Sequence, residues 1–372
     1  MVSKANCRPS PDEGRPPVPD PAPDVLPVRI TPATVASERG QLTAIARETR
    51  MLAGSDVGEM LRWAVRVGEG GALPGGGATS SRWELLATVA AQDLTVARVL
   101  EPHLDAVAIL AEDGQIPAPS TSWGVWAAEG PGSRLVARRS ETSGWVLEGR
   151  KPWCSLAGSV SHGLVTAWIN EHDRRLFAIE LADARVTVEA GTWVPAGLAQ
   201  VVTTPVTMAG VPARAVGTTG WYLQRDGFWW GGIGVAAVWY GGTVGLARRL
   251  AAQARSGQPD QLTLMHLGEV DAALAAARSA LAEAATQIER GHATGKMAAL
   301  LGTRVRHVVA TAVEDAGRHV AHALGPGPLS QEPEHVARVA DLALYLRQHH
   351  AERDAAGLGL MLVEDEDRFS PW

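Results

Sequence analysis

The 372-residue chain is poor in cysteine: Cys7 and Cys154 are the only two, and they lie far apart in segments of different character. Two such residues do not form a disulfide framework, so the sequence excludes the class of small, disulfide-stapled secreted domains. The N-terminus also lacks the apolar core of a secretory signal. We therefore expect a protein that works in a reducing compartment, the cytoplasm.

An excess of positive charge is also absent, since the net charge at pH 7 is −6. The sequence therefore lacks the excess of basic residues that is typical of nucleic-acid-binding domains. The longest uncharged run, Gly227 to Ala247, is rich in glycine and is followed by Arg248 and Arg249 within a longer helical pattern. A membrane span needs about 20 apolar residues. The pattern instead predicts a buried core helix and no membrane span.

Motifs of several other protein classes are missing. Gly75-Gly76-Gly77 lacks the Lys and Ser/Thr of a P-loop, and no Gly-x-Ser-x-Gly elbow of a hydrolase occurs. Residues 232–237 fit the dinucleotide fingerprint Gly-x-Gly-x-x-Ala, but no strand precedes them, so close packing of helices explains the small residues better. His319, His322 and the pair His349-His350 have no Glu-x-x-His pattern or Cys cluster beside them. We expect surface or capping histidines there and no metal site.

Composition divides the chain into five parts. Residues 1–30 hold eight prolines, and we predict a disordered tail because such a segment buries too little apolar area to offset its ordering entropy. Residues 31–117 have helical periodicity, and 118–224 consist of short runs rich in Val, Thr and Trp. Residues 225–358 are helical again, and 359–372 are predicted to form an acidic tail.

In the first helical part, apolar spacing predicts one helix that ends near Leu100 and a further helix that begins near Leu104. In the second, apolar seams from Val270 to Ile288 and from Met297 to Val320 predict two long helices. A shorter helix is expected from Pro333 toward His350. Together with the uncharged run described above, these helices suit a four-helix bundle.

The middle part contains short strand candidates at a spacing of roughly 10 residues, which predicts an antiparallel barrel or sandwich. Trp145 to Leu147 predicts the end of a strand, Glu148-Gly149 a turn, and the next stretch a second strand broken by Pro152. On an extended chain Trp153 and Ser155 share one face. That face suits either an ordinary hairpin with a packed indole or a site for a flat, hydrogen-bonding ring.

Residues 148–158, Glu-Gly-Arg-Lys-Pro-Trp-Cys-Ser-Leu-Ala-Gly, resemble the central-domain segment of acyl-CoA dehydrogenases, usually N-G-x-K-x-W-I-(S/T)-N-(A/G). In that family the Trp packs against the flavin and the Ser or Thr hydrogen-bonds it near N5, so the resemblance implies that Trp153 and Ser155 contact FAD. Upstream, residues 126–133 resemble the family's x-x-T-E-P-x-x-G-S segment. This implies that Trp126, Ala128 and Ser133 also lie at the flavin, with Ala128 in place of a flavin-binding Thr.

The order of an α-domain, a β-domain and a four-helix domain is also that of acyl-CoA dehydrogenases. The resemblance implies an α+β fold: an N-terminal helical domain, a central antiparallel β-barrel or sandwich and a C-terminal four-helix bundle. It further implies an FAD-dependent oxidoreductase that dehydrogenates the α,β-bond of an acyl-CoA thioester. Expected partners are an acyl-CoA or related small molecule, an electron-transfer flavoprotein and further copies of the chain in a dimer or tetramer. Arg255 is expected either at a phosphate of FAD or as a solvated loop charge.

The catalytic base is not where the family usually has it. The usual Glu follows the last bundle helix, where this chain has Gln348 and His349, and some relatives place it in the first bundle helix, where this chain has Gly231-Gly232-Ile233. Three interpretations stay open. Either His349, His350 or Glu352 is a displaced base, or the protein is similar to the flavin monooxygenases of this fold, which often use a C-terminal His. In the third, it is a degenerate subunit that binds flavin or an acyl group and catalyses little.

Overall fold

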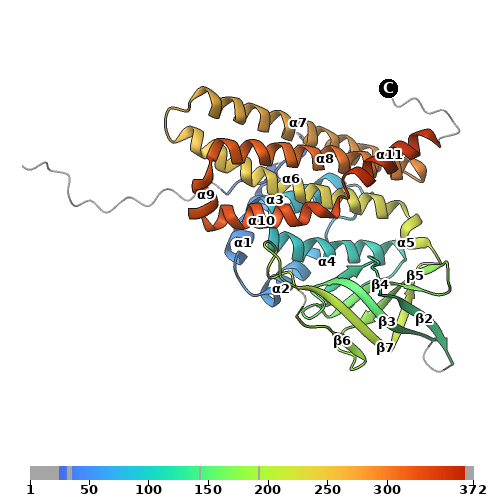
Figure 1. The fold of residues 1–372 in the computed structure, drawn as a ribbon. Helices are drawn as coiled ribbons and strands as arrows, with labels where there is room; N and C mark the ends of the chain where they lie inside the picture. Colours follow the sequence, from blue (N-terminus) through green and yellow to red (C-terminus); the bar gives the residue numbers. More distant parts are fainter. Residues whose placement is uncertain (1–24, 32–35, 142–143, 192, 365–372) are drawn as a thin grey trace, which may run out of the picture.

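The computed structural model describes residues 25–31, 36–141, 144–191 and 193–364. Figure 1 shows long helices lying above a β-barrel, with shorter helices between them and beside them. The N-terminal part forms α1 (Ala36–Leu52), α2 (Val57–Gly68), α3 (Thr79–Gln92) and α4 (Leu94–Glu112). Helix α4 contacts the barrel on one side and the long helix α6 (Asp226–Arg255) on the other. Residues of α4 are therefore well placed to line a site between the two layers.

The break between α3 and α4 lies at Asp93, so the predicted break between Leu100 and Leu104 is wrong. The Asp93 side chain accepts a hydrogen bond from the backbone N–H of Val96 at 2.8 Å and thereby caps α4. Pro102 stays inside the helix. The apolar spacing continues across the break, which is why periodicity alone did not locate it.

The last residues of the predicted tail are ordered against α3. Val28 and Ile30 are buried, and their N–H groups donate to Thr88 Oγ1 at 2.9 Å and to Glu84 Oε1 at 2.8 Å. The tail prediction is therefore wrong for residues 25–30, because this short segment finds partners for both its apolar side chains and its backbone. Residues 1–24 lie outside the described part of the chain.

The middle part forms a barrel of seven strands. These are β1 (Trp123–Trp126), β2 (Leu135–Ser140), β3 (Gly144–Ser155), β4 (His162–Trp168), β5 (Arg174–Glu180), β6 (Val186–Val188) and β7 (Thr203–Val216). Six of them follow the order β1-β4-β2-β3-β7-β5, and β6 pairs with β7 off this path. An additional pairing of β4 with β5 closes the ring. The barrel is confirmed, but β1 and β2 pair with β4 in parallel, in contrast to the antiparallel prediction.

Strand β3 runs without a turn through Glu148-Gly149, so the predicted hairpin there is wrong. Its register against β7 shifts between Leu147 and Glu148, which marks a β-bulge. Gly149 has a φ of +118°, and a Cβ at this position would lie 2.2 Å from the carbonyl oxygen of Arg134. The glycine is needed for the bulge and for close approach to β2, because only glycine adopts this conformation without strain.

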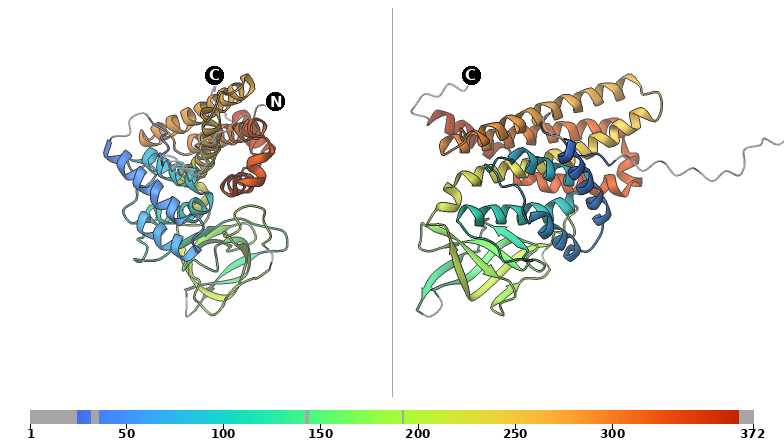
Figure 2. Two further views of the ribbon diagram at one scale, coloured as in Figure 1. Left: turned by 90° about the vertical axis from the view of Figure 1, so that its left-hand side faces the viewer. Right: turned by 180° about the vertical axis from the view of Figure 1, so that it is seen from behind.

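The C-terminal part is helical, as predicted. It comprises α5 (Trp221–Gln224), α6, α7 (Gln261–Glu289), α8 (Lys296–Leu324), α9 (Pro326–Gln331), α10 (Pro333–Tyr345), a 3-10 helix (Leu346–Gln348) and α11 (Glu352–Val363). Figure 2 shows α6, α7, α8 and α10 packed side by side as a bundle. The dinucleotide-like residues 232–237 lie inside α6 with no strand before them, in agreement with the packing interpretation. None of the helices that the structure describes is long and apolar enough to cross a membrane.

The end of the bundle differs from the prediction. Helix α10 stops at Tyr345, and after the 3-10 turn Ala351 takes a φ of +47°, so the chain changes direction before Glu352. The helix therefore does not continue to Glu352. Helix α11 extends to Val363 and so occupies the start of the segment that we predicted as an acidic tail, whereas residues 365–372 lie outside the described chain.

His103 of α4 is expected to make the protein sensitive to acid. Burial lowers its pKa to about 4, and its Nδ1 has no partner among the described residues. In the unfolded chain His103 takes up a proton near pH 6.5, whereas in the folded protein it stays neutral down to about pH 4. The contribution of His103 to the free energy of unfolding is therefore fully present above pH 6.5. It falls by about 3 kcal/mol as the pH drops from 6.5 to 4. Urea unfolding of the parent and of His103→Gln at both pH values tests this. The variant should lose about 3 kcal/mol less than the parent, and parallel curves would contradict the assignment.

Candidate functional site

The backbone at the end of β3 is not regularly extended, so Trp153 and Ser155 do not share one face in the way that strand alternation predicts. Trp153 has a φ of +58°, and the register against β7 shifts between Lys151 and Cys154. The indole of Trp153 is 60% exposed, whereas Cys154 is buried and Ser155 is half-buried. The exposed indole of Trp153 is therefore available for contact with a ligand.

Ser155 is held from three sides. Arg98 Nη2 donates to its hydroxyl at 3.3 Å, and the Thr203 hydroxyl lies 2.9 Å from the same oxygen. Trp126 Nε1 donates to its carbonyl oxygen at 3.1 Å. The indole of Trp126 is only 2% exposed and packs on Gly163, where an added Cβ would lie 2.4 Å from the ring. Trp126 therefore supports the backbone of Ser155 and leaves little surface for a cofactor.

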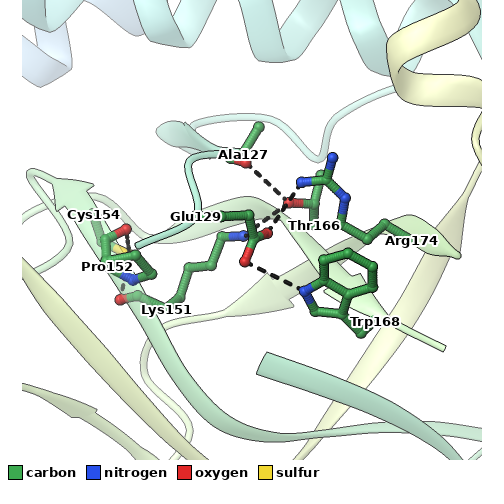
Figure 3. Close-up of polar contacts among 8 residues, drawn as sticks. All are labelled: Ala127, Glu129, Lys151, Pro152, Cys154, Thr166, Trp168 and Arg174. Carbon is green, nitrogen blue, oxygen red and sulfur yellow. Dashed lines mark hydrogen bonds and ion pairs between the residues drawn. The ribbon is translucent and has the colours of Figure 1, made fainter. Parts of the chain in front are cut away.

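An ion pair between the buried Lys151 and the partly exposed Glu129 ties the two family-like segments together (Figure 3). Lys151 Nζ donates to Glu129 Oε1 at 2.7 Å and to Thr166 Oγ1 at 2.8 Å. Burial lowers the pKa of Lys151. Burial pushes the pKa of Glu129 upward, but hydrogen bonds from Lys151 and other donors hold this pKa below its usual range. The pair fixes the strand that carries Trp153 and Ser155.

We expect Glu129→Ala to reduce the free energy of unfolding by about 3 kcal/mol, because it leaves the Lys151 ammonium buried without a counter-charge. Urea denaturation measures this loss. In the double variant Glu129→Ala/Lys151→Met, most of the stability should return, since no buried charge remains. A single-variant loss below about 1 kcal/mol would show that solvent screens the pair.

A chain of polar contacts leads from Ser155 into the helical layer. Arg98 also contacts Glu101, with 3.5 Å between Nη1 and Oε2. The Tyr345 hydroxyl donates to the same Glu101 oxygen at 3.1 Å, and the Arg98 guanidinium lies over the Tyr345 ring at 5.4 Å. The predicted flavin contact Ser155 is thus joined to a carboxylate of α4 through one arginine.

Glu101 opens onto a cavity of about 490 Å³ between α4, α6, α8 and residues 348–361. The charged side chains that line it are Glu101, Asp105, Arg225, Arg306, His350, Arg353 and Asp354. Burial raises the pKa of Glu101 and that of Asp105. Buried carboxylates with raised pKa values in a cavity are candidates for a general base.

The three predicted catalytic residues do not lie together at one site in the structure. His350 lines the cavity with a 66% exposed side chain, 3.5 Å from Asp354. His349 lies behind it and is buried, and its Nδ1 accepts the N–H of Ala351 at 3.2 Å. The proton of the neutral ring is therefore on Nε2, which has no hydrogen-bond partner among the described residues. Glu352 is exposed on α11 and does not line this cavity, so it is not a base there.

The remaining predicted flavin contacts are not gathered at Ser155. Ala128 is exposed, and the Ser133 hydroxyl accepts a hydrogen bond from Arg150 at 2.8 Å. Arg255 is exposed at the end of α6, about 30 Å along the helix axis from Val235, which lines the cavity. A role of Arg255 at a phosphate stays a prediction.

Sequence analysis missed Arg98, Glu101 and Asp105. A signal was available, because Glu101 and Asp105 are four residues apart on a helix that is otherwise largely apolar. Residues at this spacing share a face, and a pair of acids on the buried face of a helix needs a reason. Tyr345 gave no such signal, since its partner lies 244 residues away in the chain.

His319 contacts a second histidine and a neighbouring arginine. His319 Nδ1 lies 2.9 Å from His266 Nδ1, and Arg318 lies beside it. Within the described ranges no group of three or more His, Cys, Asp or Glu side chains is arranged to hold a metal ion.

No protein-family model matches the sequence, and no curated protein matches it significantly. Solved structures do match. Butyryl-CoA dehydrogenase from Megasphaera elsdenii has a TM-score of 0.76 at 15% identity, covering 90% of this chain and 100% of its own. KijD3, in complex with FMN and dTDP-3-amino-2,3,6-trideoxy-4-keto-3-methyl-D-glucose, has a TM-score of 0.72 at 16% identity, covering 90% and 95%. PigA with FAD and proline has a TM-score of 0.72 at 15% identity, covering 89% and 99%. The chain therefore has the acyl-CoA dehydrogenase fold, as the resemblance implied.

Proposed function

We propose that the protein is a flavin-dependent oxidoreductase whose substrate enters the cavity and loses a proton to Glu101. One observation carries this proposal: Glu101 lines the cavity and is joined through Arg98 to Ser155, the residue that the resemblance assigns to the flavin. The proposal replaces the base candidates of the sequence with a carboxylate from α4.

The residues at the end of β3 fit a flavin ring. Trp153 offers an exposed indole surface for stacking. The single hydroxyl hydrogen of Thr203 has two acceptors within reach, Ser155 Oγ at 2.9 Å and the Val201 carbonyl oxygen at 3.0 Å. When Thr203 donates to Ser155, the Ser155 hydroxyl hydrogen is free to bond an acceptor on a ligand. A bound flavin supplies a two-electron acceptor, or a means of activating oxygen. The flavins in the KijD3 and PigA complexes support this cofactor class, and we propose FAD first, with FMN as the alternative.

Glu101 is suited to remove a proton. Burial raises its pKa, which makes it a stronger base at neutral pH than an exposed carboxylate. Its Oε2 is occupied by Tyr345 and Arg98, whereas Oε1 has no partner among the described residues. That oxygen is available to a substrate, while the two donors fix the orientation of the carboxylate.

The finer activity that we propose first is α,β-dehydrogenation of an acyl-CoA thioester with a short, polar acyl group. The charged lining of the cavity disfavours a long alkyl chain, which would desolvate charges without pairing them. We further propose that an electron-transfer flavoprotein takes up the electrons and that the cytoplasmic enzyme is a homo-oligomer.

A second candidate is a flavin-dependent monooxygenase. His350 supports it, because it lines the cavity 3.5 Å from Asp354 and activated oxygen needs a proton donor that reaches the site. A degenerate subunit without flavin is the competing class of function, and the engagement of the Ser155 hydroxyl by Arg98 and Thr203 is compatible with it.

The deciding experiment is the absorbance spectrum of the purified full chain, alone and after incubation with FAD or FMN. A flavin spectrum with one cofactor per chain supports the proposal, and a colourless protein that takes up neither flavin would overturn it. Dye reduction by acyl-CoA thioesters without oxygen then supports the dehydrogenase. Product formed only with oxygen and supplied reduced flavin supports the monooxygenase.

A further inference from the structure

Asp105 is a carboxylate that faces the cavity without a partner. It has no hydrogen bond or ion pair with any described residue, although it lines the same cavity as Glu101 one helical turn away. Its surroundings on α6 are shaped around it, since a Cβ at Gly231 would lie 2.8 Å from Asp105 Oδ1. Glycine at position 231 thus permits a close approach of this carboxylate to α6, which a larger residue would obstruct.

The basic side chains that line the cavity, or that act on Asp105 from a distance, form no ion pair with it among the described residues; they are Arg82, Arg225, Arg306 and Arg353. Arg225 pairs with Glu112, with 2.7 Å between Nη1 and Oε1. Arg306 donates to the carbonyl oxygens of Gly232 at 2.8 Å and Gln348 at 3.1 Å. Arg225 and Arg82 lower the pKa of Asp105 from a distance, but neither forms an ion pair with its carboxylate. A cation in direct contact would therefore stabilise the ionised carboxylate further.

Aromatic rings complete a surface that suits a cation. Tyr222, Phe228 and Trp229 line the cavity and pack edge to face, with 5.5 Å between the first two ring centroids and 5.2 Å between the last two. The Arg225 guanidinium already lies over the Tyr222 ring, 5.3 Å from its centroid, so this aromatic surface accepts a cation. Rings beside a carboxylate stabilise an ammonium group through their negative faces. Burial raises the pKa of Asp105, and an ammonium in contact with the carboxylate would lower this pKa by stabilising the ionised form.

We propose that the cavity binds its substrate through a protonated amine that pairs with Asp105. The inference rests on the proposed function in taking this cavity as the substrate site. Because Glu101 lies one turn away on the same face of α4, the carbon that loses a proton is close to the amine nitrogen. The substrate class is thus a small amine with an acidic C–H near its nitrogen, such as an acyl group that carries an amine.

Isothermal titration of the full chain, with and without saturating FAD, tests this with the matched probes benzylamine and benzyl alcohol. We expect the parent to bind the amine more tightly than the alcohol. Asp105→Asn should weaken amine binding by about 100-fold and leave alcohol binding unchanged. The control Asp271→Asn removes the same charge from an exposed position of α7 and should bind both probes as the parent does.

Gly231→Ala provides a second test that keeps the carboxylate. Its methyl group would meet Asp105 Oδ1, so amine affinity should also fall, although alanine is well tolerated in a helix. Equal affinity of the parent for both probes, including no detectable binding of either, would overturn the inference. So would unchanged amine affinity in Asp105→Asn. Amine binding by a chain that takes up no flavin would leave this inference standing while the proposed function fails.

Discussion

Glu101→Gln should lower the rate of substrate oxidation by about 10²- to 10⁴-fold while flavin affinity stays unchanged. Glutamine keeps the size of the side chain and can accept from Tyr345 and Arg98, but it cannot take up a proton. General-base catalysis contributes about this factor. Reduction of the bound flavin by substrate, followed by absorbance in the absence of oxygen, measures the rate directly.

Two controls separate proton abstraction from a structural effect. Tyr345→Phe removes the hydroxyl that donates to Glu101 but leaves the carboxylate in place, so its effect should be much smaller. The pH profile of the parent should show a rate that falls on acidification through a pKa above 4.5, because burial raises the pKa of Glu101 and only the ionised form acts. A Glu101→Gln variant with full activity would exclude this base and direct attention to His350 at the same cavity.

Trp153→Ala and Ser155→Ala should each weaken flavin binding by about 10- to 100-fold, which corresponds to 1–3 kcal/mol. The first loses a stacking surface, and the second loses the hydroxyl beside Arg98. Titration of the full chain with FAD, followed by flavin fluorescence, measures both affinities. Because Trp153 is largely exposed, its removal should change the free energy of unfolding little.

Ile116→Ala is a matched control for the loss of an exposed apolar side chain, since Ile116 is 94% exposed and belongs to no part of the site. It should bind flavin as the parent does. If Trp153→Ala and Ser155→Ala both retain parental affinity, the ring does not bind at the end of β3. The oxidoreductase proposal would then lose its cofactor site, although the fold would be unaffected.

Local patterns in the sequence predicted most elements of the fold. The seam from Val270 to Ile288 lies in α7, and the seam from Met297 to Val320 lies in α8, because periodic apolar spacing is itself the condition for burying one face of a helix. The errors fall at boundaries. The cap at Asp93 and the turn at Ala351 depend on single side-chain or backbone geometries that apolar spacing does not encode.

The candidate site was predicted only in part. The resemblance led to Trp153 and Ser155, but extended-chain alternation did not foresee the bulge and the positive φ that expose the indole. The resemblance gave no catalytic base, because the positions where the family usually has it hold Gln348, His349 and Gly231. Two of the carboxylates that face the cavity, Glu101 and Asp105, come from α4.

The sequence by itself determined the three-part architecture and the two family-like segments, because both depend on the spacing of residues that are close together in the chain. The tertiary structure alone decided that Lys151 reaches Glu129 and that Arg98 links Ser155 to Glu101. It also decided that Asp105 lies unpaired beside Gly231. These contacts join residues that are distant in the chain, and their energies depend on burial, which a linear pattern does not specify.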